Sequence, residues 1–187
     1  MMKQRKLSIV ISLLWVITNA GCGAQLYKVA PLPASKSPEI ATGNDRGLQL
    51  GAAVLEGDRS IEQFEANLPL AGVAAIDVKL VNQSSAAINA KRLRFALSDG
   101  DDNLKEIPPK KALSKVMHFY GINFYRVDAR KRTQESYEAI ALNLNGMITP
   151  GEARRGFLFF ERGKNDSTSL RLTVTGDGSP ISVEVGR

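Results

Sequence analysis

Residues that carry metal or nucleophilic chemistry are scarce in this chain. Among its 187 residues it has one cysteine, Cys22, and one histidine, His118. A single cysteine cannot form an intramolecular disulfide, so core packing must hold the fold together. A catalytic triad or a zinc site would have to be built around His118 alone, and no Gly-x-Ser-x-Gly motif accompanies it. The sequence therefore predicts no catalytic residue, no metal site and no cofactor, and we expect His118 to be structural.

Nucleotide-binding glycine motifs are also missing, and a calcium-loop motif is incomplete. The run Asp99-Gly-Asp-Asp-Asn103 places oxygen-bearing side chains at alternate positions, as calcium loops do. However, Leu104 stands where an EF-hand has its turn glycine, and Lys110 stands where it has its bidentate glutamate. We expect a hairpin turn here, with calcium binding as the alternative.

Long hydrophobic runs are absent as well. The longest, Leu7–Ile17, has 11 residues, whereas a membrane-spanning helix needs about 20. It follows the basic segment Met1–Lys6 and precedes small and polar residues, which is the pattern of a signal peptide. The alternative is a signal-anchor that continues to Leu26, which would have to bury Asn19 and Gln25.

Outside this leader, basic and acidic residues are nearly balanced. The whole chain carries a net charge of +6, and three of its 25 basic residues lie in the leader. From Cys22 onward, 22 basic residues face 19 acidic ones, a net of +3. Such a balance is ordinary for a domain that does not bind nucleic acid, and no nucleic-acid partner is expected.

The residues Ala20-Gly21-Cys22, directly after the apolar run, resemble the lipobox of bacterial lipoproteins. In that family the cysteine thiol receives diacylglycerol, and the leader is cut just before it. The resemblance implies a signal peptide over residues 1–21 and a lipid anchor on Cys22. Because residue 23 is Gly rather than Asp, it implies the outer membrane if the host has two. Asn19 stands where the family usually has an apolar residue, and the alternative is ordinary cleavage after Ala24.

The segment after the cysteine has a different composition from the rest. It contains Pro31, Pro33 and Pro38 and shows no sustained periodicity. Proline-rich polar stretches stay extended, so residues 22–46 are predicted to form a flexible tether. The alternative is a first strand near Gln25–Val29 that packs on the domain.

Residues 47–187 show the sequence pattern of an antiparallel β-sandwich: short segments in which apolar and polar residues alternate, separated by turn residues. The predicted strands are Leu48–Val54, Ala74–Val81, Leu93–Leu97, Gly156–Glu161, Ser169–Thr175 and Ile181–Val185.

One stretch, about 108–135, interrupts this pattern and is interpreted as an insertion. After two prolines, Lys110–Tyr120 places Ala112, Leu113, Val116, Met117 and Tyr120 on one side of a short helix that Gly121 would end. We expect an extended piece over Asn123–Arg132 and another strand over Tyr137–Leu144.

Three segments resemble bacterial immunoglobulin-like lipoprotein domains, often called telokin-like. They are Ala74–Val81 with the following Asn82-Gln-Ser-Ser85, then Phe95-x-Leu-x-Asp-Gly100, and finally Ile148–Phe160. In the last segment Pro150-Gly151 would make the turn, and Gly156 would let the next strand start close to its neighbour. The resemblance covers about residues 47–174. It implies a mainly β, antiparallel immunoglobulin-like β-sandwich with one short inserted helix, and it brings no catalytic residues.

A short aromatic stretch is the candidate binding patch. Four of the eleven Phe and Tyr residues, Phe119, Tyr120, Phe124 and Tyr125, fall within seven positions and are followed by Arg126. Aromatic anchors beside arginine are typical of protein interfaces if they are exposed, and the alternative is that they belong to the core.

Together these patterns predict a lipid-anchored cell-envelope protein facing the periplasm or the cell surface. Its expected role is that of a non-catalytic binding or accessory module with an envelope protein as partner. The alternatives are an envelope enzyme acting on peptidoglycan or glycan, and a protein that binds a metal or another small ligand.

Overall fold

The computed structural model describes residues 26–32, 41–45, 47–122, 127–163, 169–176 and 178–186. The predicted signal peptide, Cys22 and the patch residues Phe124, Tyr125 and Arg126 lie outside this part of the chain. Within it, no helix combines the length and the apolar character that crossing a membrane requires.

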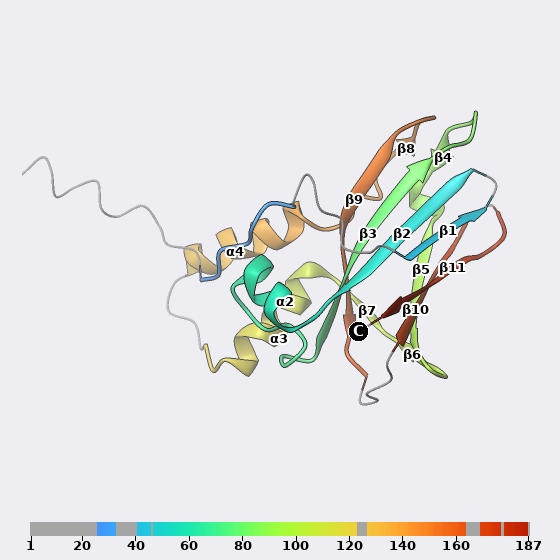
Figure 1. Ribbon diagram of the computed structural model, residues 1–187. Helices are drawn as coiled ribbons and strands as arrows, with labels where there is room; N and C mark the ends of the chain where they lie inside the picture. Colours follow the sequence, from blue (N-terminus) through green and yellow to red (C-terminus); the bar gives the residue numbers. More distant parts are fainter. Residues whose placement is uncertain are drawn as a thin grey trace, which may run out of the picture.

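The described chain is mainly β, with a separate group of helices (Figure 1). In chain order the elements are β1 (Ala41–Asp45), β2 (Leu48–Leu55), α2 (Gly57–Phe64), β3 (Val73–Asn82), β4 (Ile88–Asn89), the 3-10 turn η2 (Ala90–Arg92), β5 (Arg94–Asp99), β6 (Asp102–Leu104), β7 (Glu106–Ile107), α3 (Pro109–Phe119), α4 (Val127–Ala139), β8 (Met147–Ile148), β9 (Ala153–Glu161), β10 (Ser169–Thr175) and β11 (Ile181–Gly186).

Two sheets pack face to face around one apolar core. The first has the strand order β1-β2-β3-β9-β7, the second has the order β11-β10-β5-β6, and β4 and β8 form a small separate pair. Every strand pair of the described chain is antiparallel. The shared core takes alternate residues from both sheets, such as Ile76 and Val78 of β3 and Leu170 and Leu172 of β10. The six strands predicted from alternation are confirmed, and the arrangement is compatible with a β-sandwich.

The first sheet is buried on both faces at one end. In β9, Leu158 and Phe160 point into the core between the sheets, while Phe157 and Phe159 point to the opposite face. A second apolar cluster forms there under the helices, which lie on one side of the sheet in Figure 1. Because both faces are covered, the strand reads as an unbroken apolar run rather than as an alternation.

The predicted helix after the two prolines is confirmed as α3. Pro109 lies in its first turn, where a backbone N–H has no acceptor within the helix, so a proline there costs no hydrogen bond. Gly121 follows the end of the helix with φ +66°. Four residues of the predicted stripe are buried against the first sheet, namely Ala112, Leu113, Val116 and Met117. The fifth, Tyr120, is 44% exposed, because the helix ends at Phe119.

Two other predictions about this region are wrong. The extended piece over Asn123–Arg132 and the strand over Tyr137–Leu144 are replaced, from Val127 to Ala139, by α4. Ala129, Thr133 and Tyr137 recur every four residues and are buried on one side of this helix. The helix α2 was not predicted at all, so the described chain has three α-helices rather than one inserted helix.

Two parts of the predicted tether are packed on the domain. Residues 26–32 run along the helices without strand pairing: Leu26 N–H donates to Thr133 Oγ1 (3.0 Å), Ala30 N–H donates to Gln63 O (2.8 Å), and Tyr27 is buried. Further on, Ala41–Asp45 forms β1 and pairs with β2. The described parts of this segment therefore belong to the folded domain, because apolar residues such as Leu26 and Tyr27 contribute to the cluster under the helices.

Candidate functional site

The exposed aromatic residues lie at one end of the helical layer, next to the docked N-terminal segment. The Tyr27 and Tyr120 rings are 6.2 Å apart, centroid to centroid, and Phe119 meets Tyr120 edge-on at 5.0 Å. Tyr120 Oη accepts a hydrogen bond from the Asn67 N–H (3.0 Å), which ties the end of α3 to the loop after α2. The aromatic pair is therefore held in place rather than free.

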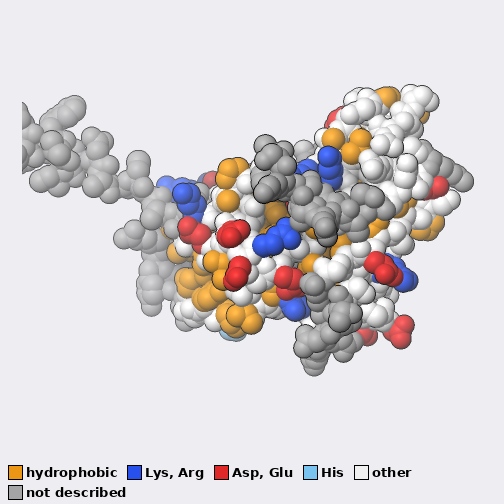
Figure 2. Space-filling view, in the orientation of Figure 1, with side chains coloured by type: hydrophobic (Ala, Val, Ile, Leu, Met, Phe, Trp, Pro, Cys, Tyr) orange, Lys and Arg blue, Asp and Glu red, His pale blue; other side chains and the backbone are white. Residues whose placement is uncertain are grey.

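Exposed apolar side chains are concentrated on this layer. Of the six large hydrophobic residues exposed in the described chain, five belong to it: Ile61, Leu70, Phe119, Tyr120 and Val127. Leu70 lies beside the aromatic pair, because Asn67 Oδ1 accepts from the Leu70 N–H (3.1 Å) while Asn67 N–H binds Tyr120. Figure 2 shows hydrophobic side chains gathered over the helical part of the molecule. Phe119 and Tyr120 are thus exposed, as a binding patch requires, and binding itself stays a prediction.

Two buried phenols lie under this surface. Tyr27 Oη and Tyr137 Oη have no hydrogen-bond partner among the described residues. Burial, with a smaller contribution from neighbouring tyrosines, raises the pKa of both above its ordinary value. Both phenols therefore stay protonated at neutral pH, and proton abstraction by either would be unfavourable.

A cavity of about 240 Å³ opens at the end of the sheets near β4 and the turn between β10 and β11. Half of its described lining residues are apolar, among them Leu48, Ile88, Leu93, Val174 and Ile181, and the others are polar residues and glycines. Asp45 is the one carboxylate among its described lining residues, whereas glycoside hydrolysis generally uses a pair. The described lining therefore offers both apolar contacts and hydrogen-bonding groups to a small ligand, but not the carboxylate pair of most glycoside hydrolases.

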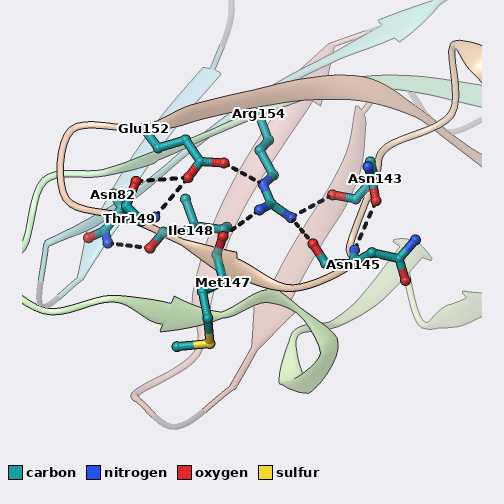
Figure 3. Close-up of polar contacts among 8 residues, drawn as sticks. All are labelled: Asn82, Asn143, Asn145, Met147, Ile148, Thr149, Glu152 and Arg154. Atoms are coloured by element: carbon teal, nitrogen blue, oxygen red, sulfur yellow. Dashed lines mark hydrogen bonds and ion pairs between the residues drawn. The ribbon is translucent and has the colours of Figure 1, made fainter.

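The turn before β9 is fixed by Arg154 (Figure 3). Its guanidinium donates to the carbonyls of Asn143 (3.2 Å) and Asn145 (2.6 Å), to that of Met147, and through Nε to Glu152 Oε1 (2.9 Å). All three guanidinium nitrogens donate to backbone carbonyls or to a neighbouring carboxylate, so this cluster organises the turn rather than presenting a group to a substrate. This cluster was not predicted from the sequence, although Arg154 two residues after Glu152 was a possible signal.

Asn82 performs a similar task on the adjacent strand end. Its Nδ2 donates to Ala86 O (2.8 Å) and Ile148 O (2.9 Å), and its Oδ1 accepts from Ser84 N–H (3.0 Å) and Ser84 Oγ (2.7 Å). The side chain is fully buried, and all four of its hydrogen-bonding positions are used. The predicted turn after this strand is therefore fixed by Asn82 itself.

The Glu152 carboxylate makes stability depend on pH. Thr149 N–H, Arg154 Nε and Thr149 Oγ1 all donate to it, and they lower the pKa of Glu152 from 4.5 to about 2. A lowered pKa means that the stabilisation is complete above the unfolded value near 4.5 and is lost as the pH falls toward 2. We expect Glu152→Gln to lower Tm at pH 6, and the difference from wild type to shrink steadily below pH 4.5. A difference that stays constant from pH 6 to pH 2.5 would contradict this.

The other residues singled out by the sequence have ordinary surroundings. Asp99 and Asp102 face each other across the β5–β6 hairpin, with Gly100 at φ +61°, so the predicted hairpin turn is confirmed. His118 is exposed near the end of α3. The described residues contain no group of three or more His, Cys, Asp or Glu side chains placed to hold a metal ion.

Comparisons with known proteins add no family to this picture. No protein-family model matches the chain, and the comparison with curated proteins gives no significant match.

Proposed function

We propose that this protein is a bacterial lipoprotein of the cell envelope, anchored through a diacylglyceryl group on Cys22 and held at the outer membrane where the host has two. One observation carries the proposal: the only cysteine directly follows a signal-like leader, and Leu26, four positions later in the chain, is docked on α4. A cysteine at this place would join a lipid anchor to the domain by a short piece of chain.

We assign the domain to the immunoglobulin-like, telokin-like type. Its two antiparallel sheets around one core support this assignment, and so do two glycines of the segment that carries the resemblance. Gly151 has φ +79° in the turn before β9, and Gly156 lies where β9 closely approaches Leu142. The helical layer is then an addition on the outer face of the first sheet.

The proposed role is non-catalytic: a binding or accessory module that acts with another envelope component. The cavity supports this role, because its mixed apolar and polar lining can receive a side chain of a partner or a small ligand. A small-ligand binding protein is therefore the second candidate. An envelope enzyme acting on peptidoglycan or glycan is less well supported, because glycoside hydrolysis generally uses two carboxylates and the described lining of the cavity contains one.

The anchor is tested by replacing Cys22 with alanine in the full chain and following the protein in membrane and soluble fractions. The wild-type protein should sediment with membranes and stay there after a high-salt wash, because acyl chains hold it by burial in lipid. Cys22→Ala should carry no diacylglyceryl group and should keep residues 1–21, because in the resembled family the leader is cut only after the thiol has been acylated. A matched Ser37→Ala variant, in the same part of the chain, should behave like wild type. A wild-type protein without the diacylglyceryl group, cut at the same place as Cys22→Ala, would contradict the proposal.

A further inference from the structure

We propose that the end of the helical layer formed by Leu70, Phe119, Tyr120 and Val127 lies against the lipid bilayer that holds the anchor. In this orientation the helical layer faces the membrane, and the cavity at the end of the sheets is directed away from it. This inference rests on the proposed lipidation of Cys22.

The first argument is reach. Leu26 is fixed to α4 by the hydrogen bond from its N–H to Thr133 Oγ1 (3.0 Å). Three residues lie between it and Cys22, and a fully extended chain covers at most about 3.6 Å per step, so the four steps from Cys22 to Leu26 span at most about 14 Å. A diacylglyceryl group on Cys22 would sit at the level of the lipid headgroups. Leu26, and with it this end of the helical layer, must then lie within about that distance of the membrane surface.

The second argument is which side chains lie near Leu26. The next residue, Tyr27, packs against Tyr120, which contacts Phe119 and is hydrogen-bonded to the loop that carries Leu70. Phe119 is 48% exposed, Leu70 64% and Val127, at the start of α4, 79%. The shortest route from the anchor to the domain therefore ends among exposed apolar side chains.

The third argument is the chemistry of these side chains. Aromatic residues favour the membrane–water interface, where the ring contacts acyl chains and a phenol stays hydrated. The helices α2, α3 and α4 together carry seven basic and five acidic residues, a net charge of +2, so electrostatic attraction to anionic lipid is expected to contribute less than apolar burial. The contact is therefore expected to depend on apolar burial and to be insensitive to salt.

The opposite end of the molecule offers a matched control. Met147 of β8 is 47% exposed, nearly the same as Phe119, and it is the one large exposed hydrophobic residue of the described chain that lies outside the helical layer. Figure 1 places β8 and β4 at the far end of the sheets from α3 and α4. A specific membrane contact should bring Phe119 but not Met147 into contact with lipid, whereas non-specific adsorption to lipid should affect both positions alike.

The test places one tryptophan at each position. The only natural tryptophan is Trp15, in the leader, and it is changed to phenylalanine in all variants. Phe119→Trp and Met147→Trp are made in the full chain, purified from membranes and reconstituted in phosphatidylcholine vesicles with brominated acyl chains, which quench tryptophan on contact. We expect the tryptophan at position 119 to lose roughly half of its fluorescence and the one at 147 almost none, in low and high salt alike.

The mass of the N-terminus, measured on the same samples, separates the two proposals. With Cys22 lipidated, an unquenched tryptophan at 119 would overturn the orientation and leave the anchor standing. Equal quenching at both positions would also overturn it. The same holds if the tryptophan at 119 is not quenched by brominated lipid and a co-purifying protein protects it from the water-soluble quencher acrylamide. An N-terminus that begins after Ala24 would overturn both proposals.

Discussion

Replacing Arg155 by methionine is expected to lower the free energy of unfolding by about 4 kcal/mol. Arg155 of β9 binds Asp77 of β3 with two hydrogen bonds, Nε to Oδ1 (3.0 Å) and Nη2 to Oδ2 (2.6 Å). Asp77 is 3% exposed, because it lies on the outer face of the first sheet at the edge of the helical layer. Without the guanidinium, a buried carboxylate loses its charged partner, and that loss outweighs the apolar contacts that methionine keeps.

Two further variants make this prediction specific. Arg171→Met removes another cross-strand ion pair, with Glu184 at 2.9 Å, but both side chains are more than half exposed, and the expected loss is below about 1 kcal/mol. Combining Asp77→Val with Arg155→Met should recover much of the stability, since no buried charge then remains. Chemical denaturation of the four proteins gives these differences. Equal losses for Arg155→Met and Arg171→Met would contradict the account.

Replacing Gly156 by alanine is expected to cost about 3 kcal/mol. A Cβ atom at this position would lie 2.5 Å from Leu142 Cα and from Leu142 N. The neighbouring atoms are backbone, and the chain there is held by hydrogen bonds from Leu142 N–H to Phe157 O (3.0 Å) and from Phe157 N–H to Ile140 O (2.9 Å). The clash is therefore relieved only by separating two hydrogen-bonded segments.

Gly186 of β11 is the matched control, because nothing lies within 4 Å of a Cβ built there. Gly186→Ala should change the free energy of unfolding by less than about 0.5 kcal/mol. Thermal and denaturant unfolding of both variants measures the contrast. A Gly156→Ala protein as stable as Gly186→Ala would show that β9 and Leu142 are not as close as described.

The strands were predictable because their side chains alternate between two environments. In β10 and β11 one face is buried and the other exposed, and the sequence shows this directly. β9 gave a continuous apolar run, Gly156–Phe160, which signals burial on both faces, but it does not identify what covers the second face.

The helices were harder to predict for a related reason. α3 has prolines at its start and four buried residues, whereas α4 buries only Ala129, Thr133 and Tyr137 and is otherwise polar. Three buried positions in thirteen residues give little periodicity, and the alternation after Tyr137 favoured a strand instead. The local sequence of α4 therefore did not distinguish a helix from an extended segment or a strand.

The candidate sites were predictable only in part. The aromatic stretch was visible in the sequence, but the exposure of Phe119 and Tyr120 depends on where the helical layer ends. The cavity draws its lining from β2, β4, β10 and β11, which lie far apart in the sequence, so no local pattern indicated it. The docking of residues 26–32 likewise depends on partners more than 30 residues away, such as Gln63 and Thr133.

The central claim, that the chain is a lipid-anchored protein held through Cys22, is tested most directly by the mass of the mature N-terminus purified from native membranes. The account predicts that residues 1–21 have been removed and that Cys22 carries a diacylglyceryl group. An unmodified N-terminus at Gln25, the product of cleavage after Ala24, would contradict it.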